Sequence, residues 1–201
     1  MNIYVETNFV LELTFEQEQW SSCEQILQLC EASQAELIIP AYSLTEPYEK
    51  LTRQSRNRKT LQLQLDAELS QLSRTASYTN LVKSIKEDIA SLMVQSNEEE
   101  RLRFDRYRQR ILSIGDVIAL TADILSEAAL CETQYGLASQ DALVFASVVS
   151  HLRNDKPHRS CFLNRNSKDF GSPDVVDQLN QFNCRVILSF ENGYEFIRSQ
   201  L

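Results

Sequence analysis

The sequence predicts an α/β protein in which a short, mostly parallel sheet is covered by helices on both faces. Short apolar and β-branched runs alternate with segments whose apolar residues recur at helical spacing. Such alternation is typical of parallel strands joined by crossover helices. A long stretch over about 53–113 contains neither glycine nor proline, and this predicts an inserted α-helical hairpin.

The expected elements follow in order along the chain. Strands are predicted at 2–5, 36–40, 161–163 and 185–188. Helices outside the hairpin are predicted at 15–33, 43–51, 116–132, 139–153, 175–182 and 191–198. Because 201 residues with 43% apolar content suit one core, we expect a single domain over 1–201, with the helical insertion at about 53–113.

The sequence also predicts where the protein acts. No stretch approaches the ~20 apolar residues that cross a membrane, and the N-terminus lacks the features of a signal peptide. The five cysteines are odd in number and widely spaced, which is typical of reduced thiols. We therefore expect a cytoplasmic protein that has no membrane partner. Two histidines are too few to favour a zinc site or a histidine-centred hydrolase.

Acidic residues follow the predicted strands. Glu6 comes directly after the first strand, Glu46 follows the second, and Asp141 opens the helix before the third. A polar segment with Asn166 and Asp169 follows the third strand. Ligand sites of parallel sheets lie beyond the carboxyl ends of the strands, and carboxylates from separate segments suit Mg²⁺ or Mn²⁺. This pattern favours a metal site.

Each acid also has a structural alternative. Ser43 and Glu46 have the spacing of a capping box. If Thr45 is the cap instead, the following proline lies in the first turn and Glu46 is freer to point elsewhere. Asp141 lies where a helix dipole favours an anion, and Glu6 could be a solvated loop residue.

Four segments, taken together and in this order, resemble the PIN-domain nucleases. They are 4–10 (YVETNFV), 39–46 (IPAYSLTE), 140–146 (QDALVFA) and 162–170 (FLNRNSKDF). The resemblance implies a Rossmann-like α/β/α fold that holds Mg²⁺ or Mn²⁺ in a cluster of acids. It also implies hydrolysis of phosphodiester bonds, commonly those of RNA. The inserted hairpin is not part of the usual family core.

By position, the resemblance assigns catalytic and metal-binding roles to Glu6, Glu46 and Asp141. It adds Asn166 and Asp169 to the metal site, and Asn8 as a residue that supports the first acid. Two positions depart from the family pattern, since Glu6 replaces the usual aspartate and Asn166 is neutral.

From the resemblance, the expected function is a metal-dependent endoribonuclease. The alternatives are a weak or inactive RNA- or protein-binding module and a toxin that an antitoxin partner silences.

Basic residues gather at both ends of the predicted hairpin, although the chain carries a net charge of −8. The residues expected to contact single-stranded RNA are Arg53, Arg56, Arg103, Arg106 and Arg110. The alternative is a solvated face on which arginines pair with Asp105 and the glutamates at 98–100. The leucine stripes of the hairpin favour internal packing or a homodimer.

Overall fold

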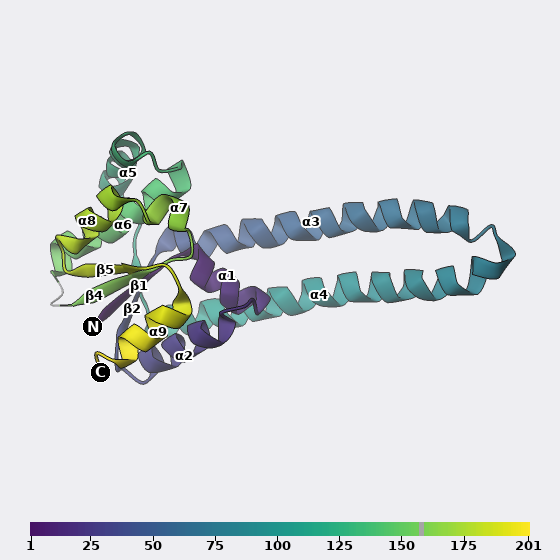
Figure 1. Cartoon of the computed structure of the whole chain (residues 1–201), viewed down its shortest axis with the longest axis horizontal. Helices are drawn as coiled ribbons and strands as arrows, with labels where there is room; N and C mark the ends of the chain where they lie inside the picture. The colour runs from purple at the N-terminus through teal and green to yellow at the C-terminus, as the bar shows by residue number, and fades with distance from the viewer. Residues whose placement is uncertain (157–158) are drawn as a thin grey trace. The chain divides into compact units, whose positions relative to one another are not determined.

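The computed structural model describes residues 1–156 and 159–201 (Figure 1). By its contacts the chain divides into two compact units. The first unit consists of Met1–Pro47 together with Phe104–Leu201, and the second consists of Tyr48–Arg103. We describe each unit in turn.

The first unit contains a five-stranded sheet in which all neighbouring strands are parallel. Its strands are β1 (Asn2–Val5), β2 (Glu36–Pro40), β3 (Asp116–Ile118), β4 (Ser160–Leu163) and β5 (Cys184–Ile187). Their order across the sheet is β3-β2-β1-β4-β5. The order runs outward from β1 in both directions, which is the doubly wound arrangement of an open α/β sheet. The predicted α/β class is confirmed.

Helices form a layer on each face of this sheet (Figure 1). The helices in the first unit are α1 (Thr7–Phe15), α2 (Trp20–Glu31), α5 (Ala122–Tyr135), α6 (Ser139–Asp155), α7 (Ser167–Phe170), α8 (Pro173–Asn180) and α9 (Phe190–Arg198). One layer contains α5, α6 and α8, and the other contains α1, α2 and α9. The fold is thus an α/β/α sandwich.

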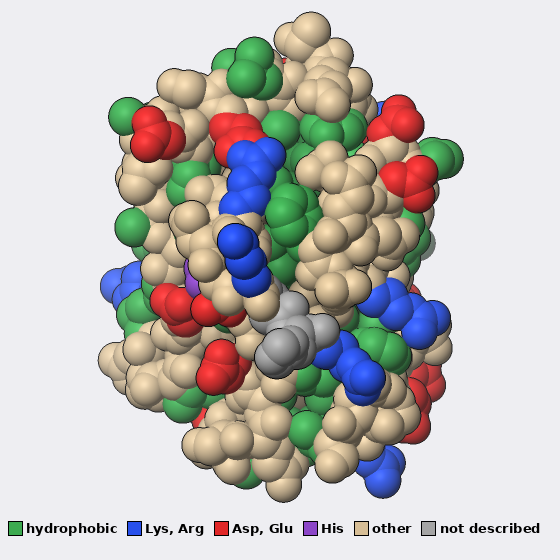
Figure 2. All heavy atoms as spheres, turned by 90° about the vertical axis from the view of Figure 1, so that its left-hand side faces the viewer, with side chains coloured by type: hydrophobic (Ala, Val, Ile, Leu, Met, Phe, Trp, Pro, Cys, Tyr) green, Lys and Arg blue, Asp and Glu red, His purple; other side chains and the backbone are tan. Residues whose placement is uncertain are grey.

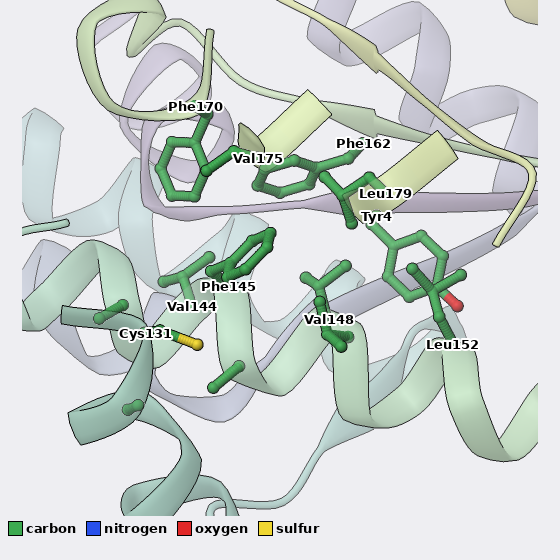
Figure 3. Close-up of a cluster of buried hydrophobic side chains, with 14 of the residues drawn as sticks. Tyr4, Cys131, Val144, Phe145, Val148, Leu152, Phe162, Phe170, Val175 and Leu179 are labelled. Atoms are coloured by element: carbon green, nitrogen blue, oxygen red, sulfur yellow. The ribbon is translucent and has the colours of Figure 1, made fainter. Parts of the chain in front are cut away.

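The layer of α5, α6 and α8 encloses a core of buried aromatic and aliphatic side chains (Figure 3). Tyr4 and Phe162 project into it from the paired strands β1 and β4. Phe145 lies opposite them on α6, and Phe170 meets Phe162 edge-to-face at a centroid distance of 5.1 Å. Full burial of such side chains contributes ~1.5–3 kcal/mol each. The alternation of side chains along β1 explains why its other residues face the opposite layer.

The layer of α1, α2 and α9 packs closely on the other face. Phe9 on α1 meets Phe190 on α9 edge-to-face at 5.5 Å. Gly193 on α9 lies so near β4 that an added Cβ would come 2.7 Å from Leu163 Cδ2. Any larger residue at this position would require the Leu163 side chain to shift. The local sequence of α9 is therefore set by its contact with the sheet.

The second unit is a helical hairpin. It is formed by parts of α3 (Ala41–Leu72) and α4 (Thr79–Ile114), with the short 3₁₀ helix Ala76–Tyr78 between them. Arg58 joins the arms by charge-assisted hydrogen bonds of 2.6 and 2.7 Å to Glu100, and Lys86 Nζ donates to Ser70 Oγ at 2.8 Å. Val82 is buried between the arms. The predicted inserted hairpin is confirmed.

Two expectations about elements are wrong. Residues 116–118 form β3, where a helix was expected, and the following helix begins only after Thr121, whose hydroxyl caps it. A strand of three residues is too short to show alternation. Helix α1 was also not expected. It is buried on nearly every side, so it lacks the polar face that reveals a helix in sequence.

Two further features concern the environment of the chain. In the described part of the chain, no helix has both the length and the apolar character needed to span a bilayer. All five cysteines are free and buried, as the sequence predicted.

Candidate functional site

The strand register brings the carboxyl ends of β1, β2 and β4 to one edge of the sheet. Tyr4 is paired with Ile38 on one side and Phe162 on the other, and Val5 is paired with Leu163. The residues that follow, Glu6 after β1 and Asn164 after β4, are therefore neighbours at this edge. Helix α3, which carries Glu46, begins directly after β2.

Glu6 is a buried carboxylate with two different oxygens. It caps α1, and its Oε2 accepts a hydrogen bond of 2.9 Å from the backbone N–H of Asn8. Its Oε1 is buried without a hydrogen-bond partner among the residues described. A buried unpaired carboxylate oxygen is unfavourable, so it needs a cation, a proton or a water. Glu6 is thus not the solvated loop residue that was one alternative.

Glu46 lies in the second turn of α3, and the hydroxyl of Thr7 donates to its Oε2. The helix begins at Ala41, two or more residues earlier than expected. Neither cap expected from the sequence is formed, because Ser43 and Thr45 both lie inside the helix. Pro47 also lies inside α3 and cannot donate to the carbonyl of the residue four before it.

Asp141 occupies the first turn of α6 and is half-buried. The side-chain amide of Asn166 lies between it and Asp169. Asn166 Nδ2 donates at 2.6 Å to Asp169 Oδ2, and weakly, at 3.4 and 3.5 Å, to the two oxygens of Asp141. Asn166 Oδ1 accepts from the backbone of Asp169 and caps α7. The neutral fourth position therefore links two acids through its nitrogen.

The carboxylates at this edge influence one another electrostatically. Burial raises the pKa of Glu6 to about 8; the hydrogen bonds from Asn8 oppose this rise, and the charges of Glu46 and Asp141 add to it. Burial also raises the pKa of Asp141 to about 6, and the charges of Asp169 and Glu46 contribute. A carboxylate whose pKa is raised by neighbouring negative charges is typical of a site that lacks positive charge.

The donor set fits a hard divalent cation. The candidate ligands are carboxylate and amide oxygens, which Mg²⁺ and Mn²⁺ prefer, and Glu6 Oε1 has no hydrogen-bond partner in the described part of the chain. Among residues 1–156 and 159–201, however, no three His, Cys, Asp or Glu side chains are arranged to hold one ion directly. The acids therefore lie at the same end of the sheet and influence one another's charge, but they do not form the ligand shell of one ion in this arrangement.

Sequence reasoning missed several polar residues at this edge. Thr7 holds Glu46, and Asn164 is fully buried, with its Oδ1 accepting from the backbone of Asn166 and its Nδ2 unpaired among the described residues. The hydroxyl directly after Glu6 was a signal that the sequence offered. Nothing in the sequence indicated that Glu12, buried on α1, would form an ion pair with Arg165. This pair joins α1 to the loop that follows β4.

The predicted RNA-contacting arginines lie in different surroundings. Arg53 and Arg56 are exposed on α3, and Arg106 is exposed on α4 with its guanidinium 5.0 Å from the ring of Tyr107. Arg103 forms an ion pair with Glu99 at 3.6 Å. Arg110 forms ion pairs with glutamates of α2. Pairing within the helices, the alternative reading, therefore holds for some arginines and not for all.

Arg110 connects the end of α4 to α2 within the first unit. Its guanidinium donates to both oxygens of Glu24 at 2.8 Å and to both oxygens of Glu31 at 2.8 and 3.0 Å. The hydrogen bond from Arg110 lowers the pKa of Glu24. These bonds use most of the five donors of a guanidinium, so the evident role of Arg110 is structural.

An α/β/α sandwich with carboxylates beyond the carboxyl ends of its central strands is consistent with a PIN-like fold. The chain matches the PIN domain over residues 3–170 and belongs to the PIN-domain family. The matched range includes Glu6, Glu46, Asp141, Asn166 and Asp169. Comparisons with curated proteins and with solved structures give no match.

Proposed function

We propose that this PIN-domain protein is an endoribonuclease that hydrolyses phosphodiester bonds of single-stranded RNA with Mg²⁺ or Mn²⁺. Glu6, Glu46 and Asp141 would hold the ion after their side chains draw closer together than in the present arrangement, and Asn166 and Asp169 would complete the site. The observation that carries the proposal is the buried Oε1 of Glu6, which is unpaired among residues 1–156 and 159–201 and is influenced by the charges of Glu46 and Asp141. PIN domains generally use divalent metals, which agrees with this donor set.

The residues around the acids position them. The Asn8 N–H fixes one oxygen of Glu6, so the longer side chain is oriented although aspartate is usual at this position. Thr7 fixes Glu46, and Asn166 contacts both Asp141 and Asp169. When bound, the metal would polarise the phosphoryl oxygen and lower the pKa of a coordinated water. Burial of the acids would strengthen these electrostatic interactions.

The test compares the wild type with Asp141→Asn on single-stranded RNA in Mn²⁺. The matched control is Asp174→Asn, since Asp174 is also an acid in the first turn of a helix, α8. We expect Asp141→Asn to lower the cleavage rate by about hundredfold or more, and the control to leave it unchanged. Cleavage that persists in Asp141→Asn would refute the proposed site.

A second function, RNA or protein binding without catalysis, is favoured by the geometry of Asn166. Its amide donors face Asp141 and Asp169, where an acid would add negative charge for a metal. Absence of cleavage across metals and RNA substrates, together with retained RNA binding, would support this reading. Co-purification of a tightly bound inhibitor that restores growth would identify a toxin–antitoxin pair.

The hairpin is the proposed partner surface. We propose that residues 1–201 act as one PIN-like domain carrying this insertion, and that Arg53 and Arg56 on the hairpin supply exposed positive charge for RNA. Arg106, which lies in the first unit, would supply exposed positive charge there. Exposed leucines on the hairpin, such as Leu63 and Leu92, suit a homodimer. Neutralising the arginines should weaken RNA binding and its salt dependence, whereas polar replacement of the leucines should change the oligomeric state.

A further inference from the structure

An open cavity of about 600 Å³ lies at the end of the sheet opposite the acids. It is formed where β4 and β5 begin, with contributions from the turn after α8 and from α9. Its polar and aromatic lining includes Arg159, Arg185, Asn180, Asn183, Gln200 and Phe196. Figure 2 shows this face of the molecule, where several Lys and Arg side chains lie near the middle. The cavity belongs entirely to the first unit.

The charge of the cavity differs from that of the chain. Two arginines line it, and none of the lining residues that are described is acidic, although the chain as a whole carries −8. Guanidinium groups present several donors in one plane, which suits the oxygens of a phosphate. A cavity that concentrates positive charge on an acidic protein is suited to an anionic ligand.

Both guanidinium groups are held in place by neighbours. Arg159 Nη1 donates to Gln200 Oε1. The guanidinium of Arg185 lies over the ring of Phe196, 5.0 Å from its centroid, and so makes a cation–π contact. Guanidinium groups and aromatic rings are both groups on which a planar base can stack. Preorganisation of this kind lowers the entropy that binding costs.

The turn before β5 is also fixed. Asn183 has a left-handed backbone (φ 55°), and its carbonyl accepts from the backbone N–H of Ser160 at 3.2 Å. This bond ties the start of β5 to the start of β4. It places Asn183 and Asn180 at the cavity, where carboxamides offer both donors and acceptors. Such groups can pair with the edge of a nucleobase, which carries both hydrogen-bond donors and acceptors.

We propose that this cavity binds a nucleotide, with its phosphate at Arg159 and Arg185 and its base against the cation–π pair of Arg185 and Phe196. The volume lies in the ~300–1,000 Å³ range of small-molecule sites and exceeds what inorganic phosphate fills. The nucleotide is either free in solution or the terminal residue of an RNA strand. The proposal does not depend on catalysis, because the site is at the opposite end of the sheet from the acids.

The experiment measures binding by isothermal titration calorimetry in EDTA, which removes any metal-dependent cleavage. The probes are the four 5′-mononucleotides, adenosine, inorganic phosphate, and a short RNA with or without a 5′-phosphate. The variants are Arg159→Ala and Arg185→Ala. Arg198→Ala is the matched control, since Arg198 also lies over an aromatic ring of α9, that of Tyr194, at 5.6 Å, and does not line the cavity.

We expect mononucleotides to bind more tightly than adenosine or phosphate, and each cavity variant to weaken this binding by about tenfold or more. The control and Asp141→Asn should bind as the wild type does, so loss of nuclease activity would leave this result intact. Tighter binding of the 5′-phosphorylated RNA identifies an RNA end as the ligand, and equal binding identifies a free nucleotide. No binding, binding unchanged in both cavity variants, or phosphate binding as tightly as nucleotides would overturn the proposal.

Discussion

Replacing Glu6 with glutamine removes a carboxylate that the fold buries without a partner for one oxygen. The carbonyl of glutamine can still accept the hydrogen bond from the Asn8 N–H, so the cap of α1 is retained. Glutamine does not titrate, so it avoids the free-energy cost of protonating a buried carboxylate at neutral pH, and the cost of a buried negative charge beside Glu46 and Asp141 at higher pH. We therefore expect Glu6→Gln to stabilise the metal-free protein at neutral pH.

The size of the effect follows from the pKa of Glu6. The pKa of Glu6 is about 8 in the folded protein and 4.5 ordinarily. Between pH 4.5 and pH 8 the folded state therefore keeps a proton on Glu6 that the unfolded state has lost. The wild type therefore loses stability as the pH rises from 4.5 to 8. At pH 7 the loss is about 3 kcal/mol, and above pH 8 it levels off. At pH 4 the carboxyl is protonated in both states and the penalty vanishes.

The assay is urea unfolding of the wild type and Glu6→Gln across this pH range in EDTA. Glu36→Gln is the matched control, because Glu36 is exposed at the start of β2. We expect the stability difference between Glu6→Gln and the wild type to grow with pH, and the control difference to stay flat. A Glu6→Gln variant less stable than the wild type at pH 7, or a difference independent of pH, would refute the reasoning.

The same pair of proteins tests the metal. Saturating Mn²⁺ at about a hundred times its Kd should stabilise the wild type by about 2.7 kcal/mol. Glu6→Gln should lose most of this stabilisation, since it lacks the free carboxylate oxygen. Equal stabilisation of both proteins would place the ion away from Glu6.

Two further predictions concern packing in the first unit. Arg165→Ala leaves Glu12 buried and without its ion-pair partner, and should cost about 3 kcal/mol in urea unfolding. Arg153→Ala, which removes a more exposed ion pair, should cost much less; similar losses in both variants would contradict this. Gly193→Ala should cost about 1–3 kcal/mol, because its Cβ would meet Leu163. Adding Leu163→Val shortens the opposing side chain, so the double variant should lose less stability than the two single variants lose in sum. A loss of stability equal to that sum would argue against this contact.

Much of the fold could be predicted from the sequence because its signals are local. Four of the five strands were predicted near their observed positions, since apolar runs such as 36–40 end in turn or helix signals. The hairpin was predicted from the absence of helix breakers. β3 was missed because three residues carry no periodicity, and α1 because a helix buried on nearly all sides has no amphipathic pattern.

The sequence by itself determined that acids follow the strands and that the chain resembles the PIN family. Tertiary structure decided what each acid meets. The register sets Glu6 beside Asn164, burial raises the pKa of Glu6, and Arg110 is drawn to α2 rather than left free for RNA. Whether an acid follows a strand depends on the neighbouring sequence. Its burial, its interaction with other charges and its hydrogen-bond partners depend on segments that only folding brings together.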